Sequence, residues 1–392
     1  MRLTTLLPTL LSISLPITST AAKPPAPSRL WATHYNGNVY TLSLDKSTSN
    51  LSITDTQKTC GKMPSWLTFD SESRIVYCSD EDGTADLSTH GSLTAYHPDR
   101  QGRLHEITSV ETVGGGVDSV IYEVGKEKFI AIAHYTSAQE FHFKLTHPGA
   151  VPQQDSPHPH SVFLDPTGSF ILSPDLGADL LRIYSISSTG KLTTCPPPVN
   201  VTFGSGPRHG LFWTDGTDNH TASTGTGISH QREMAAVGKT MLYLVNEIGG
   251  TMMTFDVSYA RSGCLDLSLK QTLVPYPAAD QKDHKLPSGA TPAEIRLVGD
   301  KFYVSIRSDQ GFAPGDSMVT LDRVPGMGVP RTFAVNRAGD LVAIGNQASA
   351  NVAIVRRDRV TGELGEKVAV LQVGEPGTVG QAEGLSSVIW EE

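Results

Sequence analysis

The sequence reads Gly206-Pro207-Arg208-His209-Gly210-Leu211-Phe212-Trp213 and, further along, Tyr243-Leu244-Val245-Asn246-Glu247. The first run joins a proline and two polar residues to an apolar strand, and the second is an apolar strand that ends abruptly in polar groups. The polar ends, Arg208, His209 and Glu247, are residue types that hold a charge or transfer a proton. This pattern is one copy of a unit that recurs along the chain.

Apolar runs like the first strand of this unit occur seven times. Most are followed by a turn rich in Asp, Gly or Ser and then by a second apolar strand; a third alternating strand (180–184, 352–355) and a Gly-led fourth (190–193) follow in places. Four short strands and about forty residues per repeat are typical of propeller blades. The first strands are expected at 65–69, 117–122, 160–164, 208–212, 293–297, 331–335 and 386–390. The second strands are expected at 75–78, 129–133, 170–172, 241–245, 301–306 and 341–344.

The two ends of the pattern complement each other. The last unit, 386–390, has only a first strand, while 30–34, 39–44 and 51–54 supply a second, third and fourth strand without a first. Joining them closes the ring and removes an open sheet edge. The sequence therefore predicts an all-β, seven-bladed β-propeller that forms one domain over 23–392. Polar insertions at about 214–231 and 276–288 are interpreted as surface loops, and the sequence does not decide whether they form a lid.

Composition excludes some partners. The 392-residue chain is 38% hydrophobic and 18% charged, which fits a folded protein, and its formal net charge is −9. It has no long basic run, which argues against nucleic acid and against an anionic membrane surface as partners. We expect a small-molecule partner, and the sequence leaves the oligomeric state open.

The N-terminus has the pattern of a secretory signal peptide over 1–22: Arg2, an apolar run, and small residues before Lys23. Secretion is expected, and the sequons at Asn50, Asn200 and Asn219 fit a glycoprotein. The four cysteines could form two disulfides in that compartment. Cys60 with Cys78 is the preferred pair because they are close in sequence, with four buried thiols as the alternative. The cysteines show no zinc-ligand spacing.

Strand register predicts a site. In each blade the first strand leaves one face of the ring and the second returns to it, so their ends should meet around one mouth. Almost all of these positions are polar, and a concave mouth with converging polar groups is the default site. The first-strand positions are Ser65, Asp118, His160, Arg208, His209, Glu294, Arg331 and Ser386. The second-strand positions are His34, Asp80, His134, Asp175, Glu247, Arg307, Asn346 and Gln347.

Chemical type suggests roles within this set. Arg208 and Arg307 suit a carboxylate or an oxyanion, and Glu247 and His160 suit proton transfer. His158 is expected at the surface. A metal site built from Asp155, Asp175, Glu294 and the histidines is an alternative that ligand spacing does not support, and no GxSxG or HExxH motif is present. The substrate-binding candidates are His34, His134, His209, Glu294, Arg331 and Asn346.

Four motifs carry a resemblance that covers nearly the whole mature chain. They are His158-Pro159-His160-Ser161, Gly206-Pro207-Arg208-His209, Tyr243-Leu244-Val245-Asn246-Glu247 and Thr291-Pro292-Ala293-Glu294-Ile295. Their sequence and order resemble the seven-bladed propeller lactonases, which include bacterial 6-phosphogluconolactonases and fungal 3-carboxy-cis,cis-muconate lactonizing enzymes. The resemblance implies His160, Arg208, Glu247 and Arg307 as catalytic residues, with no metal or organic cofactor. Around Arg307 the chain reads Ile-Arg-Ser-Asp, whereas the phosphogluconolactonase branch usually has Asn-Arg there.

Three functions follow as hypotheses. The first is a secreted lactonase, or a lactone-forming cyclase of the carboxy-cis,cis-muconate type, acting on a small carboxylate-bearing lactone derived from a sugar or an aromatic acid. The expected secretion argues against a phosphorylated sugar lactone. The second is a non-catalytic extracellular propeller that binds a ligand or a protein on the same face, because fold alone does not establish activity. The third is a metal-dependent lactonase.

Overall fold

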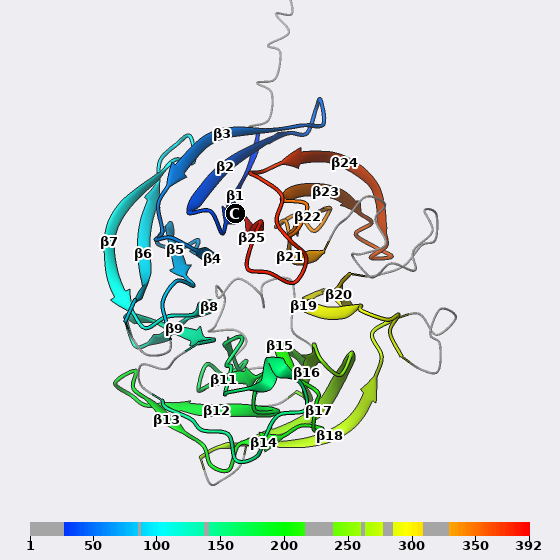
Figure 1. Ribbon diagram of the computed structural model, residues 1–392. Coiled ribbons are helices and arrows are strands. Elements are labelled where there is room, and N and C mark those ends of the chain that lie inside the picture. The colour runs from blue at the N-terminus through cyan, green and yellow to red at the C-terminus, as the bar shows by residue number, and fades with distance from the viewer. Residues whose placement is uncertain are drawn as a thin grey trace, which may run out of the picture.

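The computed structural model describes residues 27–84, 88–136, 141–215, 238–259, 263–276, 285–308 and 329–392. Within these ranges the chain is almost entirely β-structure, in seven sheets set around a common centre (Figure 1). The single helix there is the 3₁₀ turn Pro152–Gln154, so no helix of the described chain is long or apolar enough to cross a membrane. The predicted all-β, seven-bladed propeller is confirmed.

Blades are numbered 1 to 7 in order around the ring. Four of them, blades 1, 2, 5 and 7, have four strands each, and blade 1 takes its first strand from the C-terminal end of the described chain. Blade 1 is β25 (Leu385–Trp390), β1 (Ser28–His34), β2 (Asn38–Asp45) and β3 (Asn50–Lys58). Blade 2 is β4 (Pro64–Asp70), β5 (Ile75–Asp80), β6 (Gly91–Pro98) and β7 (Leu104–Thr112). Blade 5 is β15 (Pro207–Thr214), β16 (Thr240–Asn246), β17 (Thr251–Tyr259) and β18 (Leu265–Leu273).

The remaining blades follow the same order with some variation. In the described residues, blades 3 and 6 have two strands, and blade 4 has a short fifth strand beside its third. Blade 3 is β8 (Gly116–Val124) and β9 (Glu127–His134), and blade 6 is β19 (Thr291–Val298) and β20 (Lys301–Arg307). Blade 4 is β10 (Phe163–Leu164), β11 (Phe170–Asp175), β12 (Leu180–Ile186), β13 (Leu192–Thr194) and β14 (Val199–Asn200). Blade 7 is β21 (Pro330–Val335), β22 (Leu341–Asn346), β23 (Asn351–Arg357) and β24 (Leu364–Gln372).

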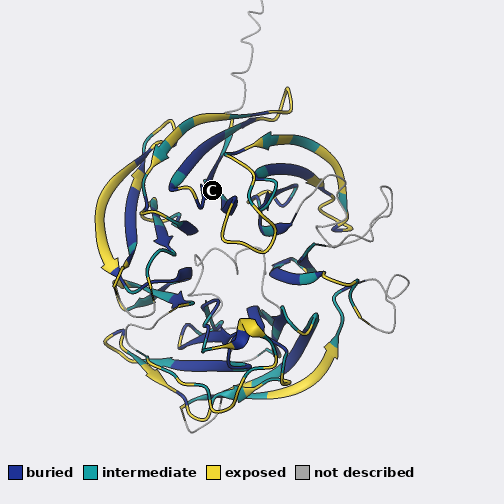
Figure 2. Cartoon of the chain, in the orientation of Figure 1, coloured by how far each residue is buried: buried dark blue, intermediate teal, exposed yellow. Residues whose placement is uncertain are grey.

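Burial follows the position of a strand in its blade. The first three strands of a blade are mostly buried, whereas the outer strands β7 and β24 are mostly exposed, as Figure 2 shows. Inner strands pack against sheets on both sides, so they read as nearly continuous apolar runs, and the outer strands alternate because one face meets solvent. Each core therefore lies between neighbouring blades.

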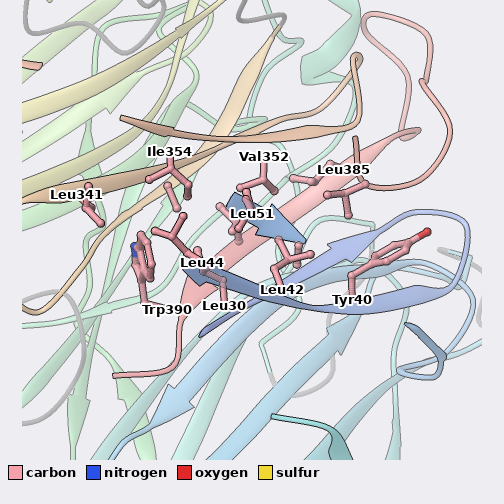
Figure 3. Packing of buried hydrophobic residues seen from close by; sticks show 14 residues of the cluster. Leu30, Tyr40, Leu42, Leu44, Leu51, Leu341, Val352, Ile354, Leu385 and Trp390 are labelled. Atoms are coloured by element: carbon pink, nitrogen blue, oxygen red, sulfur yellow. The ribbon is translucent and has the colours of Figure 1, made fainter. Parts of the chain in front are cut away.

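The ring closes as the sequence predicts. Strand β25 pairs antiparallel with β1, so that Trp390 lies opposite Leu30 and Val388 opposite Ala32. The closed blade then packs on blade 7, in a cluster that includes Leu385, Leu42 and Ile354 (Figure 3). Pairing and packing together leave β1 without an open edge.

Both pairs of cysteines are bonded. Cys60 bonds Cys78, which confirms the preferred pair, and Cys195 bonds Cys264. The alternative of four free thiols is wrong. The second bond joins the end of blade 4 to blade 5, where Cys195 already lies in a core shared by the two blades.

The predicted strands are found in the predicted order; several, such as β3 and β11, are longer than predicted, and β10 is shorter. Strand β10 covers only 163–164, because the backbone is irregular at 159–162, although the His160 amide still donates to the Pro174 carbonyl at 2.9 Å. The expected signal peptide, the sequon at Asn219 and most of the inserts at 214–231 and 276–288 lie outside the described residues. Asn50 and Asn200 are exposed.

Candidate active site

A repeated backbone contact places the site residues. In five blades, the residue just after the second strand donates its amide to the carbonyl of the residue just before the first strand, and in blade 4 Leu176 donates in the same way to His158, all at 2.7–3.0 Å. The first strand of six blades, all except blade 4, also has a register irregularity, as between Pro207 and His209. The bulged residue turns its side chain out of the regular alternation. The six residues fixed by the backbone contact are Tyr35, Glu81, Tyr135, Leu176, Glu247 and Gln347.

Arg208 occupies the bulge of blade 5, and its flanking sequence explains the placement. Gly206 has φ +56°, a conformation that favours glycine, and its amide donates to the Asp179 carboxylate at 2.7 Å. A Cβ on Gly210 would lie 2.6 Å from the Phe163 ring of blade 4. These contacts fix the backbone on both sides of Arg208, whose side chain is 2% exposed.

Glu247 holds two arginines together. Its Oε2 lies 2.7 Å from Arg208 Nε, and its Oε1 pairs with Arg307 Nη2. Arg208 Nη1 also donates to the Ala293 carbonyl at 2.8 Å. Burial alone would raise the pKa of Glu247, but the two guanidinium groups outweigh it and the pKa lies below its ordinary value. Glu247 is therefore an anion at neutral pH.

His160 lies beside this ion-pair group, among aromatic side chains. Its ring is 5.6 Å from the His209 ring and 5.6 Å from Tyr135, in an edge contact with the latter, and His209 in turn lies 5.9 Å from Trp66. Burial, followed by the charge of Arg208, lowers the pKa of both histidines well below the ordinary value. Both rings are neutral at pH 7, and His160 Nδ1 is buried without a hydrogen-bond partner in the described chain.

A second group lies across blades 1, 2 and 7. Glu81 Oε2 accepts hydrogen bonds from Tyr35 Oη at 2.7 Å and from Ser65 Oγ at 2.6 Å. Arg331 Nη2 is 3.8 Å from the same oxygen, and its guanidinium carbon lies 5.5 Å from the centre of the Tyr35 ring. The pKa of Arg331 is raised, since Tyr35 and Glu81 outweigh its burial.

Both groups belong to one site. Trp66, whose ring lies 5.9 Å from that of His209, directly follows Ser65, whose hydroxyl donates to Glu81, so the two groups are joined through blade 2. Two surface clefts, of about 460 Å³ and 500 Å³, are lined by none of these side chains.

Four second-strand positions were read one residue too early in the sequence. His34, Asp80, His134 and Asp175 are the last residues of their strands, and in blades 1 to 3 the neighbours that follow, Tyr35, Glu81 and Tyr135, enter the site instead. A shift of one residue turns a strand side chain to the opposite face. His34 Nε2 contacts the Glu375 carbonyl at 2.9 Å, and His134 Nδ1 contacts the Gly114 carbonyl at 3.3 Å.

The other strand-end residues also form hydrogen bonds with residues of their own blade. Asp80 accepts the Met63 amide at 2.8 Å, and Asp175 accepts two bonds from the Arg182 guanidinium. Asn346 donates to Asn351 at 2.8 Å. The predicted substrate-binding roles of His34, His134 and Asn346 thus have no support in the geometry, because these side chains fasten turns.

Asp118 and Glu294 link blades. Asp118 Oδ2 accepts the Val162 amide at 3.0 Å, and Glu294 Oε2 accepts the equivalent amide of Phe333 at 3.2 Å. Glu294 also pairs with Arg296 and is fully buried. Burial raises the pKa of Asp118 to about 8. Asp118 lies just after the bulge of its strand and Glu294 within the irregularity between Pro292 and Ile295, and both carboxylates bond to the next blade.

His158 is buried, not exposed as expected. Its ring stacks on Tyr135 at 4.1 Å, and its Nε2 lies 2.8 Å from Asp155 Oδ1. Asp155 therefore pairs with His158, as Asp175 pairs with Arg182 and Glu294 with Arg296. In the described parts of the chain, no three His, Cys, Asp or Glu side chains are grouped as metal ligands.

Sequence reasoning missed Glu81, Tyr35 and Tyr135. Glu247 lies one residue beyond Asn246, the pairing partner of Pro207, and the same count on blades 1 to 3 reaches the three missed residues. The signal was present in the repeat register.

Known proteins share the sequence pattern and the fold of this chain. Residues 29–380 match a family model described as "Lactonase, 7-bladed beta-propeller". A relative from Arthroderma benhamiae, named "Probable 6-phosphogluconolactonase", is 28% identical over 374 residues, which cover 86% of this chain and 84% of the relative. The 6-phosphogluconolactonase of Formosa agariphila is 25% identical over 331 residues, covering 76% and 83% of the two chains. The periplasmic gluconolactonase of Pseudomonas aeruginosa has the same fold, with a TM-score of 0.65 at 23% identity over 93% of this chain and 99% of that one.

Proposed function

The chain belongs to the seven-bladed β-propeller lactonase family, and we propose that it is a hydrolase that opens the ring of a small lactone carrying a carboxylate. One observation carries the proposal: Glu247 holds Arg208 and Arg307 together beside the neutral, buried ring of His160. Paired guanidinium groups beside a proton acceptor suit a reaction in which negative charge develops on a carbonyl oxygen. The relatives named for lactone hydrolysis support the same reaction.

His160 is the proposed general base. Its Nδ1 has no partner in the described chain, and its low pKa keeps it unprotonated at neutral pH. It takes a proton from water while the water oxygen bonds to the lactone carbonyl carbon. When the ring C–O bond breaks, the leaving oxygen receives that proton, and the product is an open-chain hydroxy acid. Glu247 is less available as a base because both of its carboxylate oxygens already contact guanidinium groups.

Arg208 and Arg307 are the proposed oxyanion donors. The Ala293 carbonyl accepts a hydrogen bond from Arg208 Nη1, and the Glu247 carboxylate forms an ion pair on the Nε side, so the guanidinium is held from two sides. Such fixed donors need no reorganisation as charge builds on the carbonyl oxygen. Glu247 is thus a positioning residue that orients both cations.

A lactone panel tests the proposal. Purified protein is assayed for ring opening of sugar-derived and aromatic-derived lactones by acid release, beside Arg208→Gln and the control Arg356→Gln. Arg356 forms an exposed ion pair with Glu366 and serves as a matched loss of charge outside the site. We expect a loss in kcat/KM of about 10² to 10³ for Arg208→Gln and none for the control. Equal activity of the two variants would refute the assignment.

Two rival functions are outcomes of the same panel. Open-chain cis,cis-muconate acids are included, and ring closure without ring opening would identify a cyclase that uses the same arginines to hold carboxylates. Binding of these acids without turnover in either direction would identify a non-catalytic binding propeller. Activity that follows the content of a bound divalent ion would identify a metal-dependent lactonase.

Export is a separate part of the proposal. Two disulfides in the chain and exposed sequons at Asn50 and Asn200 fit an oxidising, secretory route. Expression in a secreting host should release protein that begins at Lys23. Retention in the cell with residues 1–22 intact would contradict export and leave the proposed chemistry unaffected.

A further inference from the structure

The charges of the site are not balanced. Among the described residues, three arginines, Arg208, Arg307 and Arg331, face two carboxylates, Glu247 and Glu81, while the nearby pair of Arg296 and Glu294 cancels and the histidines are neutral. Buried charges in a low-dielectric site need partners. One unit of positive charge is therefore left for a ligand to balance.

Arg331 is the arginine whose positive charge lacks an anion in direct contact. Glu247 contacts both Arg208 and Arg307 directly, so those two cations already share an anion. Arg331 lies 3.8 Å from Glu81, beyond hydrogen-bond range, and its guanidinium makes no hydrogen bond to the described residues. The Arg331 side chain is only 11% exposed, so water cannot supply all of the hydrogen bonds that the guanidinium lacks.

Glu81 cannot readily turn to meet Arg331. The hydroxyl groups of Tyr35 and Ser65 both donate to its Oε2, at 2.7 Å and 2.6 Å, and Ser65 itself is fully buried. These two bonds occupy the oxygen that is nearest the guanidinium. Tyr35 also lies beside Arg331, with its ring centre 5.5 Å from the guanidinium carbon, which limits how that side chain can turn.

We propose that Arg331 binds a second acidic group of the substrate, remote from the lactone carbonyl, while Glu81 accepts a hydrogen bond from a neighbouring ring hydroxyl. The substrate class is then a hydroxylated lactone with a free carboxylate, such as the monolactone of a sugar diacid. A neutral aldonolactone would leave Arg331 unpaired. The inference rests on the proposed function, and it assigns carboxylate recognition to a different arginine from those that stabilise the reacting oxygen.

A matched pair of substrates tests the assignment. Glucaro-1,4-lactone carries the extra carboxylate, and the corresponding neutral gluconolactone does not. Arg331→Gln should lower kcat/KM for the acidic lactone by about 10- to 100-fold, the range of a lost charge-assisted bond, mostly through KM. The neutral lactone should change by less than about threefold. Arg331→Lys should recover part of the preference, because it restores the charge but not the planar fork.

Three results would overturn the inference: equal losses on the two lactones, no loss on either, or full activity of Arg331→Gln on the acidic lactone alone. Arg356→Gln is the control, and thermal melts of each variant exclude misfolding. Calorimetric binding of glucarate and gluconate needs no turnover. If wild-type protein opens neither lactone, the proposed hydrolysis fails, but the glucarate preference of Arg331 is still tested.

Discussion

Glu247 and Glu81 occupy equivalent places in two blades and have opposite surroundings. Each follows the second strand of its blade, and each donates its amide to the residue before the first strand. Glu247 meets two guanidinium groups, whereas Glu81 meets two hydroxyl groups and has a cation at 3.8 Å. The repeated backbone therefore delivers a carboxylate to the site, and the neighbours contributed by other blades determine what that carboxylate does.

The difference assigns separate tasks to the two halves of the site. A carboxylate shared by two arginines fixes cations in place, which suits stabilisation of charge in a transition state. A carboxylate held by hydroxyl groups keeps acceptor capacity for a ligand and leaves its nearby cation free. Binding and chemistry are thus divided between two copies of one structural position.

The largest expected effect comes from exchanging the two carboxylates for amides. Glu247→Gln removes the charge between Arg208 and Arg307, so the cations repel each other and lose their orientation. We expect kcat/KM to fall by about 10² to 10³. Glu81→Gln keeps an oxygen acceptor for Tyr35 and Ser65, and kcat should change by less than about threefold. Steady-state kinetics on one lactone measures both.

That pair of variants also supplies its own control, because each is the same substitution at an equivalent backbone position. Equal losses would mean that the surroundings do not divide the tasks. Glu81→Gln should in addition bind open-chain acids somewhat more tightly, since Arg331 then has no competing anion.

The pH dependence of kcat shows which group of the site accepts the proton. His160 has its pKa lowered by burial, so it is unprotonated and active at pH 7 and becomes protonated only well below the ordinary value of 6.5. Activity should be flat through neutrality and fall as pH decreases through that lowered pKa. His160→Gln should lower kcat by about 10²-fold and remove this acid limb. An acid limb that persists in His160→Gln would assign the proton transfer to another group.

Asp118 is a buried carboxylate, and unlike Glu247 and Glu81 it has no cation within ion-pair distance among the described residues. Burial raises its pKa to about 8, so the folded state binds a proton that the unfolded state releases above about pH 4. Stability from this group is present below the unfolded pKa and is lost as pH rises toward 8. Asp118→Asn does not ionise, and we expect it to gain about 2 kcal/mol relative to wild type between pH 4 and pH 8.

Urea unfolding of wild type and of Asp118→Asn at about pH 4 and about pH 8 measures this gain in unfolding free energy. Asp165→Asn is unsuitable as a control because Asp165 caps a turn with four bonds, so Asp266→Asn on the exposed β18 serves. A constant difference at all pH values would show that Asp118 does not change its proton binding on folding.

The smallest effect is expected from Tyr35→Phe. The variant removes one of two hydroxyl donors to Glu81 and keeps the ring beside Arg331. Stability should fall by about 1 kcal/mol, and Glu81, freed on one side, should approach Arg331 and weaken the binding of acidic ligands by about threefold. Calorimetry with glucarate checks the second effect, and tighter binding would contradict it.

Much of the architecture was predictable because propeller blades repeat. The apolar runs gave both inner strands of each blade, and the unmatched runs at 30–54 and 386–390 predicted the pairing of β25 with β1. The side-chain direction at strand ends was harder, because a single bulge reverses it. Arg208 and Glu247 lie in contact with each other, whereas His34 and His134 lie one residue before Tyr35 and Tyr135. Neighbours such as Tyr35 beside Arg331 come from different blades, and no pattern within one repeat predicts them.

The pairing of β25 with β1 has a consequence for the order of synthesis. Strands β1 to β3 leave the ribosome first, yet their blade gains its inner strand only after every other blade has been made. The first sheet to be translated is the last to be finished. A nascent chain that stops short of Leu385 keeps an unpaired strand edge at β1, which chaperones and proteases can recognise. Only a chain translated through β25 covers this edge.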